Sequence, residues 1–168
     1  GAGLGSQWRT VMMFFNREAF GEVDPEFGLD IGFFVFTLPM LSLVLSFIIR
    51  LLVAAWIVAL FMHYLYGGID PTQKPMYFSS KARVHLAVLG AVSALTAAAW
   101  FWLSRYELLI GENYRYSGAS YTDVQASLPA REIMAGVSII IAGIFVYVAF
   151  KGRIRVAIAG LAVALIAQ

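Results

Sequence analysis

The sequence has no cysteine and little charge. Without cysteine the chain has no disulfide, no thiolate nucleophile and no cysteine-bound metal or iron–sulfur centre. Only 13% of its 168 residues are charged, about half the share that is usual in soluble domains. The formal net charge of +2 is too small to indicate a nucleic-acid partner. The remainder is 61% hydrophobic with a mean hydropathy of +0.79, which indicates a membrane protein whose first partner is the lipid bilayer.

Three apolar runs have the length of about 20 residues that a membrane-spanning helix needs. We predict an all-α, multi-pass transmembrane bundle with helices over residues 38–66, 81–109 and 129–150. The candidate N-caps are Thr37, Ser79 or Ser80, and Ser127. Pro39 favours the first start, because proline is common in the first turn of a helix.

A fourth apolar run, residues 154–168, is too short to cross and is not closed by a charge. The chain also opens with "GAGLGS", without methionine and without a signal-peptide pattern. We expect a piece of a longer polypeptide, whose missing parts, or other membrane subunits, are further partners. The alternative is a re-entrant or interfacial last segment.

The distribution of basic residues predicts the orientation. The connections after the first and third helices carry six of the twelve basic residues: Lys74, Lys81, Arg83, Lys151, Arg153 and Arg155. Because basic loops stay on the cytoplasmic side, we expect both connections there. Every acid except Asp70 falls on the opposite side. Residues 1–37 are therefore predicted as an external interfacial segment, residues 38–168 as the transmembrane module, and the loop between the second and third helices as external.

The stretch "FGEVDPEFGLDIGFFVFTLP" mixes acids and aromatic rings directly before the first span. Aromatic rings favour the headgroup level of a bilayer. Within it, "VDPEFG" is typical of a turn that Asp24 and Pro25 open and Gly28 closes. Upstream, "SQWRTVMMFFN" is either a helix in the membrane interface or the outer end of a preceding span.

Small side chains recur on the second and third helices, and they predict close helix packing. They are Ala87, Gly90, Ala91, Ala94, Ala97 and Ala98, and then Gly136, Ser138, Ala142 and Gly143.

Arg50 is the one charge well inside a predicted span. It lies about 18 Å along the first helix from Leu38, near the middle of the bilayer. A charge there costs at least about 2.5 kcal/mol, so we expect it to face the bundle interior or water and to have a partner. Ser46 and Ser42 share its face. The partner itself is expected in the missing sequence or in a lipid phosphate.

His63 and His85 are the only histidines, each about one turn from the inner end of its helix. Two imidazoles without a carboxylate make a poor metal site, so no metal is predicted. A histidine in a span is also a ligand for a tetrapyrrole such as haem or chlorophyll, and this is the one cofactor that the sequence suggests. The alternative is a hydrogen bond at a helix interface.

No catalytic constellation is visible. The external loop holds Ser117, Ser120 and Thr122, but "SGAS" is not a G-x-S-x-G elbow and no histidine lies on that side. The opening glycines do not form a G-x-G-x-x-G fingerprint. We therefore predict no catalytic residue and a non-enzymatic protein.

Five stretches together resemble the large multi-pass bacterial proteins of uncharacterised protein family 0182. They are "FGEVDPEFGLDIGFFVFTLP", "HYLYGGI", "ARVHLAVLGAV", "RYELL" and "GASYTDVQASLPARE". The resemblance implies a bacterial plasma-membrane protein with further spans and a large extracytoplasmic domain, of which this chain is the middle of the membrane part. It implies no activity. It marks, as external-motif residues of a shared role, Asp24, Asp30, Arg105, Glu107, Ser120, Tyr121 and Asp123. Other matching positions are Pro25, Gly28, His63, Gly67, Gly68 and Gly118.

Two functions follow as hypotheses. The first is a membrane module that anchors an external domain, or that handles envelope material or a solute. The second is an accessory subunit of a larger respiratory or photosynthetic membrane complex, with a tetrapyrrole at His63 or His85.

Overall fold

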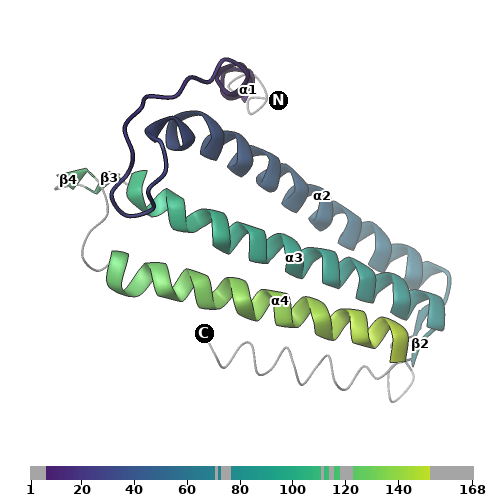
Figure 1. The fold of residues 1–168 in the computed structure, drawn as a ribbon. Coiled ribbons are helices and arrows are strands. Elements are labelled where there is room, and N and C mark those ends of the chain that lie inside the picture. The colour runs from purple at the N-terminus through teal and green to yellow at the C-terminus, as the bar shows by residue number, and fades with distance from the viewer. Residues whose placement is uncertain are drawn as a thin grey trace. The chain divides into compact units, whose positions relative to one another are not determined.

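The computed structural model describes residues 7–70, 72, 77–110, 112–113, 116–117 and 123–151. The described residues form four α-helices (Figure 1): α1 (Gln7–Phe15), α2 (Leu38–Leu65), α3 (Ser80–Ile110) and α4 (Leu128–Lys151). The connections hold two short antiparallel strand pairs: β1 (Ile69–Asp70) with β2 (Tyr77–Phe78), and β3 (Glu112–Asn113) with β4 (Tyr116–Ser117). The all-α class is confirmed. The fourth apolar run lies outside the described residues.

Within the described part of the chain, three helical stretches are long and apolar enough to cross a membrane: Phe33–Leu65, Ser80–Leu108 and Gln125–Lys151. Their ends lie close to the predicted ones, with one difference. Two π-helical stretches, η1 (Phe33–Thr37) and η2 (Asp123–Ser127), run directly into α2 and α4. Thr37 and Ser127 are therefore not N-caps, and that prediction was wrong. Ser79 does cap α3, because its Oγ accepts a hydrogen bond from the Ala82 N–H at 3.1 Å.

The first helical stretch begins earlier because Asp30 starts it. The Asp30 carboxylate accepts the N–H of Gly32 at 2.6 Å, and its carbonyl accepts the N–H of Phe33 at 2.9 Å. A carboxylate at this place satisfies backbone donors that the first turn of a helix leaves without a partner.

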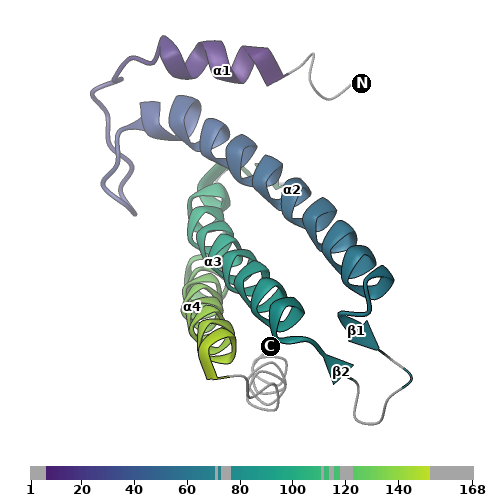
Figure 2. The same ribbon diagram turned by 90° about the vertical axis from the view of Figure 1, so that its right-hand side faces the viewer.

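The chain forms two compact units. The first unit comprises Gly1–Phe47 and Trp100–Glu132, and the second comprises Ile48–Ala99 and Ile133–Gln168. The core of the first unit is the buried cluster of Phe34, Leu38 and Leu103, with Tyr106 packed against it. In the same unit α1 contacts η1, and Figure 2 shows α1 beside the start of α2.

The core of the second unit is formed where α3 meets α4. Ala87 packs against Val148, and the ring of Phe145 lies on Gly90 so closely that a Cβ at Gly90 would be 2.7 Å from it. From α2, the Trp56 Nε1–H donates a hydrogen bond to Ser93 Oγ at 3.0 Å. Antiparallel packing through small residues is typical of membrane helices.

The small-residue prediction is confirmed for α3 and corrected for α4. On α3 the buried members are Ala87, Gly90, Ala91, Ala94 and Ala98. On α4 the buried small residues are Ala135, Ser138 and Ala142. Gly136 and Gly143 are exposed, and a Cβ added to either would meet no atom within 4 Å. Each is one position after a buried alanine, and one step along a helix turns the side chain by about 100°.

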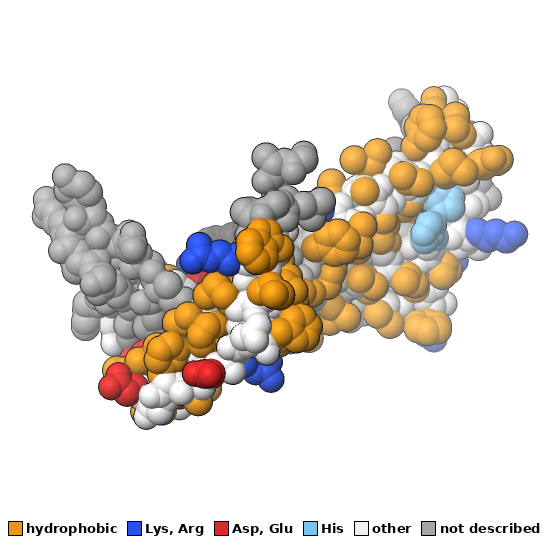
Figure 3. Space-filling view, turned by 90° about the horizontal axis from the view of Figure 1, so that it is seen from above, with side chains coloured by type: hydrophobic (Ala, Val, Ile, Leu, Met, Phe, Trp, Pro, Cys, Tyr) orange, Lys and Arg blue, Asp and Glu red, His pale blue; other side chains and the backbone are white. Residues whose placement is uncertain are grey.

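The outer surface is largely apolar. Only 6% of the most apolar window of the first span is buried, and residues such as Ile57, Val58 and Phe61 are exposed. Hydrophobic side chains cover most of the described face in Figure 3. Such a surface needs a lipid bilayer or further apolar protein around it.

Candidate functional site

The loop of residues 20–32, which we call the carboxylate loop, is built around Asp30. Its carboxylate accepts three backbone hydrogen bonds, from the N–H groups of Gly32 at 2.6 Å, Gly21 at 2.9 Å and Phe20 at 3.2 Å. These bonds, that of Gly32 above all, hold the pKa of Asp30 below its usual value against a smaller opposing effect of desolvation. Asp30 therefore works as a structural acceptor that closes the loop.

Asp24 organises the tip of the carboxylate loop. Its Oδ2 accepts the N–H groups of Glu26 at 2.9 Å and Phe27 at 2.8 Å. Its carbonyl accepts the N–H of Gly28 at 2.8 Å, and Gly28 has a φ of +64°, which favours glycine. The predicted turn is thereby confirmed. An Asp followed by proline is typical of this geometry, since the side chain takes over backbone donors.

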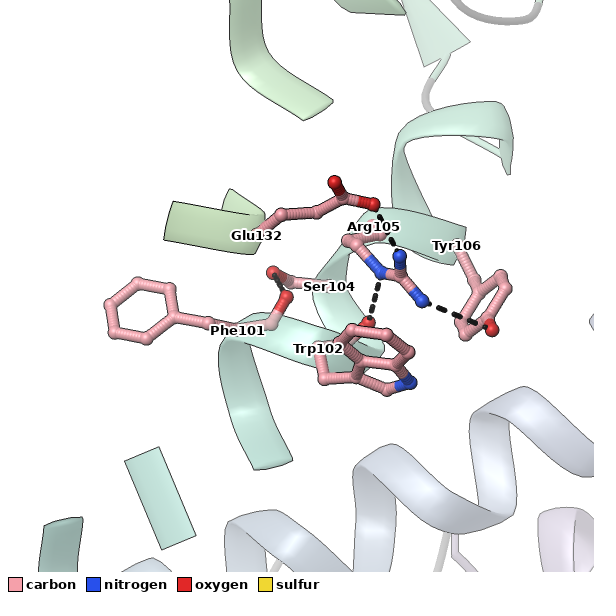
Figure 4. Close-up of polar contacts among 6 residues, drawn as sticks. All are labelled: Phe101, Trp102, Ser104, Arg105, Tyr106 and Glu132. Atoms are coloured by element: carbon pink, nitrogen blue, oxygen red, sulfur yellow. Dashed lines mark hydrogen bonds and ion pairs between the residues drawn. The ribbon is translucent and has the colours of Figure 1, made fainter. Parts of the chain in front are cut away.

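Arg105 lies near the end of α3 and is only 7% exposed (Figure 4). Its Nη1 pairs with Glu132 Oε1 of α4 at 2.5 Å, its Nε donates to the Trp102 carbonyl at 3.2 Å, and its Nη2 donates to the Tyr106 hydroxyl at 3.3 Å. The guanidinium carbon also lies 3.4 Å from the centroid of the Trp102 ring, within reach of a cation–π interaction. This buried cation is thus held by three hydrogen bonds and by the face of an aromatic ring.

Tyr106 connects this cluster with the carboxylate loop. Its ring lies 4.8 Å from that of Phe27 and 5.3 Å from that of Phe33, both in edge geometry. On the next position Glu107 accepts a hydrogen bond from Ser42 of α2 at 2.6 Å. The loop and the neighbouring ends of α2, α3 and α4 are therefore joined within the first unit.

The described polar side chains of this arrangement bond within the protein. Asp24, Asp30, Arg105 and Glu107 all have hydrogen-bond partners inside the protein. In the described ranges no three His, Cys, Asp or Glu side chains are grouped as a metal site would require.

The second unit brings the two histidines together. His63 Nε2 lies 3.0 Å from His85 Nδ1, which is a direct hydrogen bond between α2 and α3. One ring must donate and the other accept, so at least one imidazole is neutral in this contact. His63 is half-buried and His85 is exposed. This geometry is that of a hydrogen bond at a helix interface, the alternative given above. Ligation of a tetrapyrrole by either histidine stays a prediction.

The end of α2 fixes the position of His63. The N–H of Gly68 donates to the His63 carbonyl at 2.7 Å, and the N–H of Gly67 donates to the Tyr64 carbonyl at 3.2 Å. This bond pair, with a φ of +66° at Gly67, is a Schellman motif. A Cβ on Gly68 would lie 3.1 Å from His63 Nδ1, so the second glycine leaves room for the ring.

Arg50 is exposed and has no hydrogen bond or ion pair with any residue that the structure describes. It lies 17 residues after Phe33 and 15 before Leu65, at the middle of the first span. Ser46 bonds the carbonyl of Leu43 in its own helix, and Ser42 bonds Glu107, so neither serves Arg50. A partner in the rest of the polypeptide or in the bilayer stays a prediction.

The side chains of three external-motif residues are not described by the structure. Ser120 and Tyr121 lie outside the described residues, as does the side chain of Asp123. Glu132 and Tyr106 were not predicted as partners in the cluster. The signal for the first was present, since "RYELL" carries an arginine near the end of one predicted helix and "LPARE" carries a glutamate near the start of the next.

The model of the uncharacterised protein family UPF0182 matches residues 1–168. The chain belongs to this family. Similar UPF0182 proteins are those of Corynebacterium efficiens, 47% identical, and Kocuria rhizophila, 42% identical, each over 95% of this chain. That of an Arthrobacter species is 41% identical over 99% of the chain. The chain spans about 16% of the length of these relatives. No solved structure matches it.

The five UPF0182 stretches fall into two spatial groups. "FGEVDPEFGLDIG", "RYELL" and "LPARE" meet in the first unit, through the carboxylate loop, Tyr106 and the Arg105–Glu132 pair. "HYLYGGI" and "ARVHLAVLGAV" meet in the second unit through the two histidines.

Proposed function

We propose that this part of a UPF0182 protein is a non-enzymatic membrane module that anchors an external domain of the same polypeptide in the bacterial plasma membrane. The observation that carries the proposal is the joining of the carboxylate loop to the ends of α2, α3 and α4 by Tyr106, Glu107 and Arg105. An anchor needs such a connection, because force on the external part must reach the spanning helices. Arg105 and Glu107 of the motif are used in that connection, and Asp24 and Asp30 hold the loop itself.

The anchor predicts that function follows the amount of folded protein. In a strain whose UPF0182 gene is deleted, full-length variants Phe27→Ala and Arg105→Ala should restore the lost phenotype only in proportion to their amount in the membrane. Asp24→Asn is the informative case, since a reaction centre would need this carboxylate. A variant that is present at the wild-type amount and yet fails to restore the phenotype would contradict the anchor and indicate chemistry.

A role in handling a solute or envelope material rests on Arg50. A charge at the middle of a span is costly, and it marks substrate pathways in many membrane proteins. If this role holds, full-length Arg50→Leu should be produced normally but fail to restore the phenotype. Arg9→Leu, on the exposed side of α1, is the control. If Arg50→Leu restores the phenotype as the wild type does, the role in handling a solute or envelope material is excluded and the anchor proposal remains.

The accessory-subunit hypothesis is favoured by one observation, the position of His85. His63 Nε2 is occupied by His85, and His63 Nδ1 lies against Gly68, so the exposed His85 is the better placed ligand through its Nε2. The purified full-length protein should then show a Soret or Qy absorption band that His85→Leu removes. A spectrum without either band would end the tetrapyrrole version.

A further inference from the structure

A groove lined by apolar side chains runs between α3 and α4 in the second unit. Its walls include Val84, Val88, Val92 and Leu95 of α3, and Val146 and Phe150 of α4. Its volume of about 550 Å³ lies in the range of pockets that take small-molecule ligands. The α3 wall extends for about 16 Å along the helix axis. A groove of this length and apolar lining suits a hydrocarbon chain.

Three cations lie at one end of the groove. Lys81 precedes Val84 by three residues and so shares its face of α3. Arg83 is next to Val84, and Lys151 directly follows Phe150. Because Ala87 packs on Val148 and Gly90 on Phe145, the two helices run antiparallel in a register that brings Arg83 level with the end of α4, at Lys151.

None of these cations has an acidic partner among the described residues, in which the one ion pair is that of Arg105 with Glu132. Arg83 Nε is also buried without a hydrogen-bond partner, the only such side-chain atom in the described part of the chain. A buried donor without an acceptor is unfavourable, and an anion beside the charged Arg83 guanidinium would offset part of that cost.

We propose that the α3–α4 groove is a binding site for an anionic phospholipid. One acyl chain lies along the apolar groove, and the phosphate binds Arg83 with help from Lys81 and Lys151. A free phosphate would not use the apolar groove, whereas an anionic phospholipid uses both the groove and the cations at its end. Basic pockets between membrane helices bind anionic headgroups by this combination of charge and apolar contact.

The test is lipid binding by the purified full-length protein. Phosphatidylglycerol and phosphatidylcholine with identical acyl chains are added, and the bound lipid is counted by native mass spectrometry. We expect phosphatidylglycerol to bind at least about fivefold more tightly, because one basic residue near a membrane surface contributes about that factor. Arg83→Gln should lose most of this preference, while Val88→Phe, which fills the groove, should weaken the binding of both lipids.

Two controls separate the site from general effects. Arg9→Gln removes a cation on α1, and Val58→Phe enlarges an exposed side chain on α2, outside the groove; both should bind as the wild type does. Should Arg83→Gln fold poorly, Lys81→Gln serves instead, since Lys81 is exposed. The preference of Lys81→Gln for phosphatidylglycerol over phosphatidylcholine should fall as well. Equal binding of the two lipids, or no effect of Arg83→Gln and Lys81→Gln, would overturn the proposal. Exclusion of lipid by another span of the polypeptide seated in the groove would do the same.

Discussion

At the scale of single residues, Asp30 makes the stability of the carboxylate loop depend on pH. Its usual pKa is 3.8, and the three backbone N–H bonds lower the value in the folded loop. As the pH falls, the unfolded loop therefore binds a proton first. The stabilising contribution is complete above about pH 4 and disappears as the pH falls through the lowered pKa.

Hydrogen exchange of residues 20–32 in the full-length protein should accordingly rise as the pH is taken from about 6 to about 2, after correction for the intrinsic exchange rate. Asp30→Asn should exchange faster at neutral pH and lose this pH dependence. Glu26→Gln is the control, because the Glu26 side chain accepts no hydrogen bond from the described residues. A pH profile of Asp30→Asn that matches the wild type would contradict the role of this carboxylate.

The contribution of Arg105 to stability depends on the shape of its side chain as well as on its charge. Its three nitrogens bond Glu132, the Trp102 carbonyl and the Tyr106 hydroxyl, and a lysine would keep the charge but lose this fork. We expect Arg105→Lys to lower the free energy of unfolding in detergent by about 2 kcal/mol. Arg9→Lys, on the surface of α1, should leave it unchanged. A melting curve of Arg105→Lys equal to that of Arg9→Lys would show that charge alone matters.

At the scale of elements, two glycines of α3 and α4 differ in the space available for a side chain. A Cβ on Gly90 would lie 2.7 Å from the ring of Phe145, whereas a Cβ on Gly136 would meet open space. We expect Gly90→Ala to destabilise the protein by about 1–3 kcal/mol, since overpacking forces side chains out of their rotamers. Gly136→Ala should be neutral or slightly stabilising, because alanine is the better helix former.

Thermal unfolding of the two variants in the same detergent checks this directly. Equal melting temperatures for both would mean that Phe145 moves aside at little cost. The same comparison tests whether Gly136 lies outside the contact between α3 and α4. The glycines that the sequence marks on α4 are at its surface, and alanine and serine take their place at the contact.

The starts of the helices show why some element boundaries were harder to predict than others. Ser79 is followed by an ordinary helix, so its capping bond is readable from the sequence. Thr37 has the same chemistry, yet Asp30 and the ring packing of Phe33 against Tyr106 start the helical stretch several residues earlier. A capping propensity is a local preference, and long-range packing outweighs it there.

At the scale of the whole molecule, the basic connections predict on which side each loop lies. In full-length protein freed of other cysteines, Glu26→Cys should be labelled on intact cells by a maleimide that does not cross membranes. Thr72→Cys and Lys151→Cys should be labelled only after the cells are opened, since both belong to the basic connections. Labelling of Glu26→Cys and Thr72→Cys from the same side would overturn the predicted orientation.

The sequence by itself determined the membrane character, the three spans and the turn at Asp24. These depend on composition and on neighbours a few residues away, which a single chain displays directly. Only the tertiary structure decided that Arg105 meets Glu132, that Ser42 meets Glu107 and that His63 meets His85. These partners lie 27, 65 and 22 residues apart. Their pairing depends on the register between antiparallel helices, which many interchangeable apolar contacts set together and which no local pattern encodes.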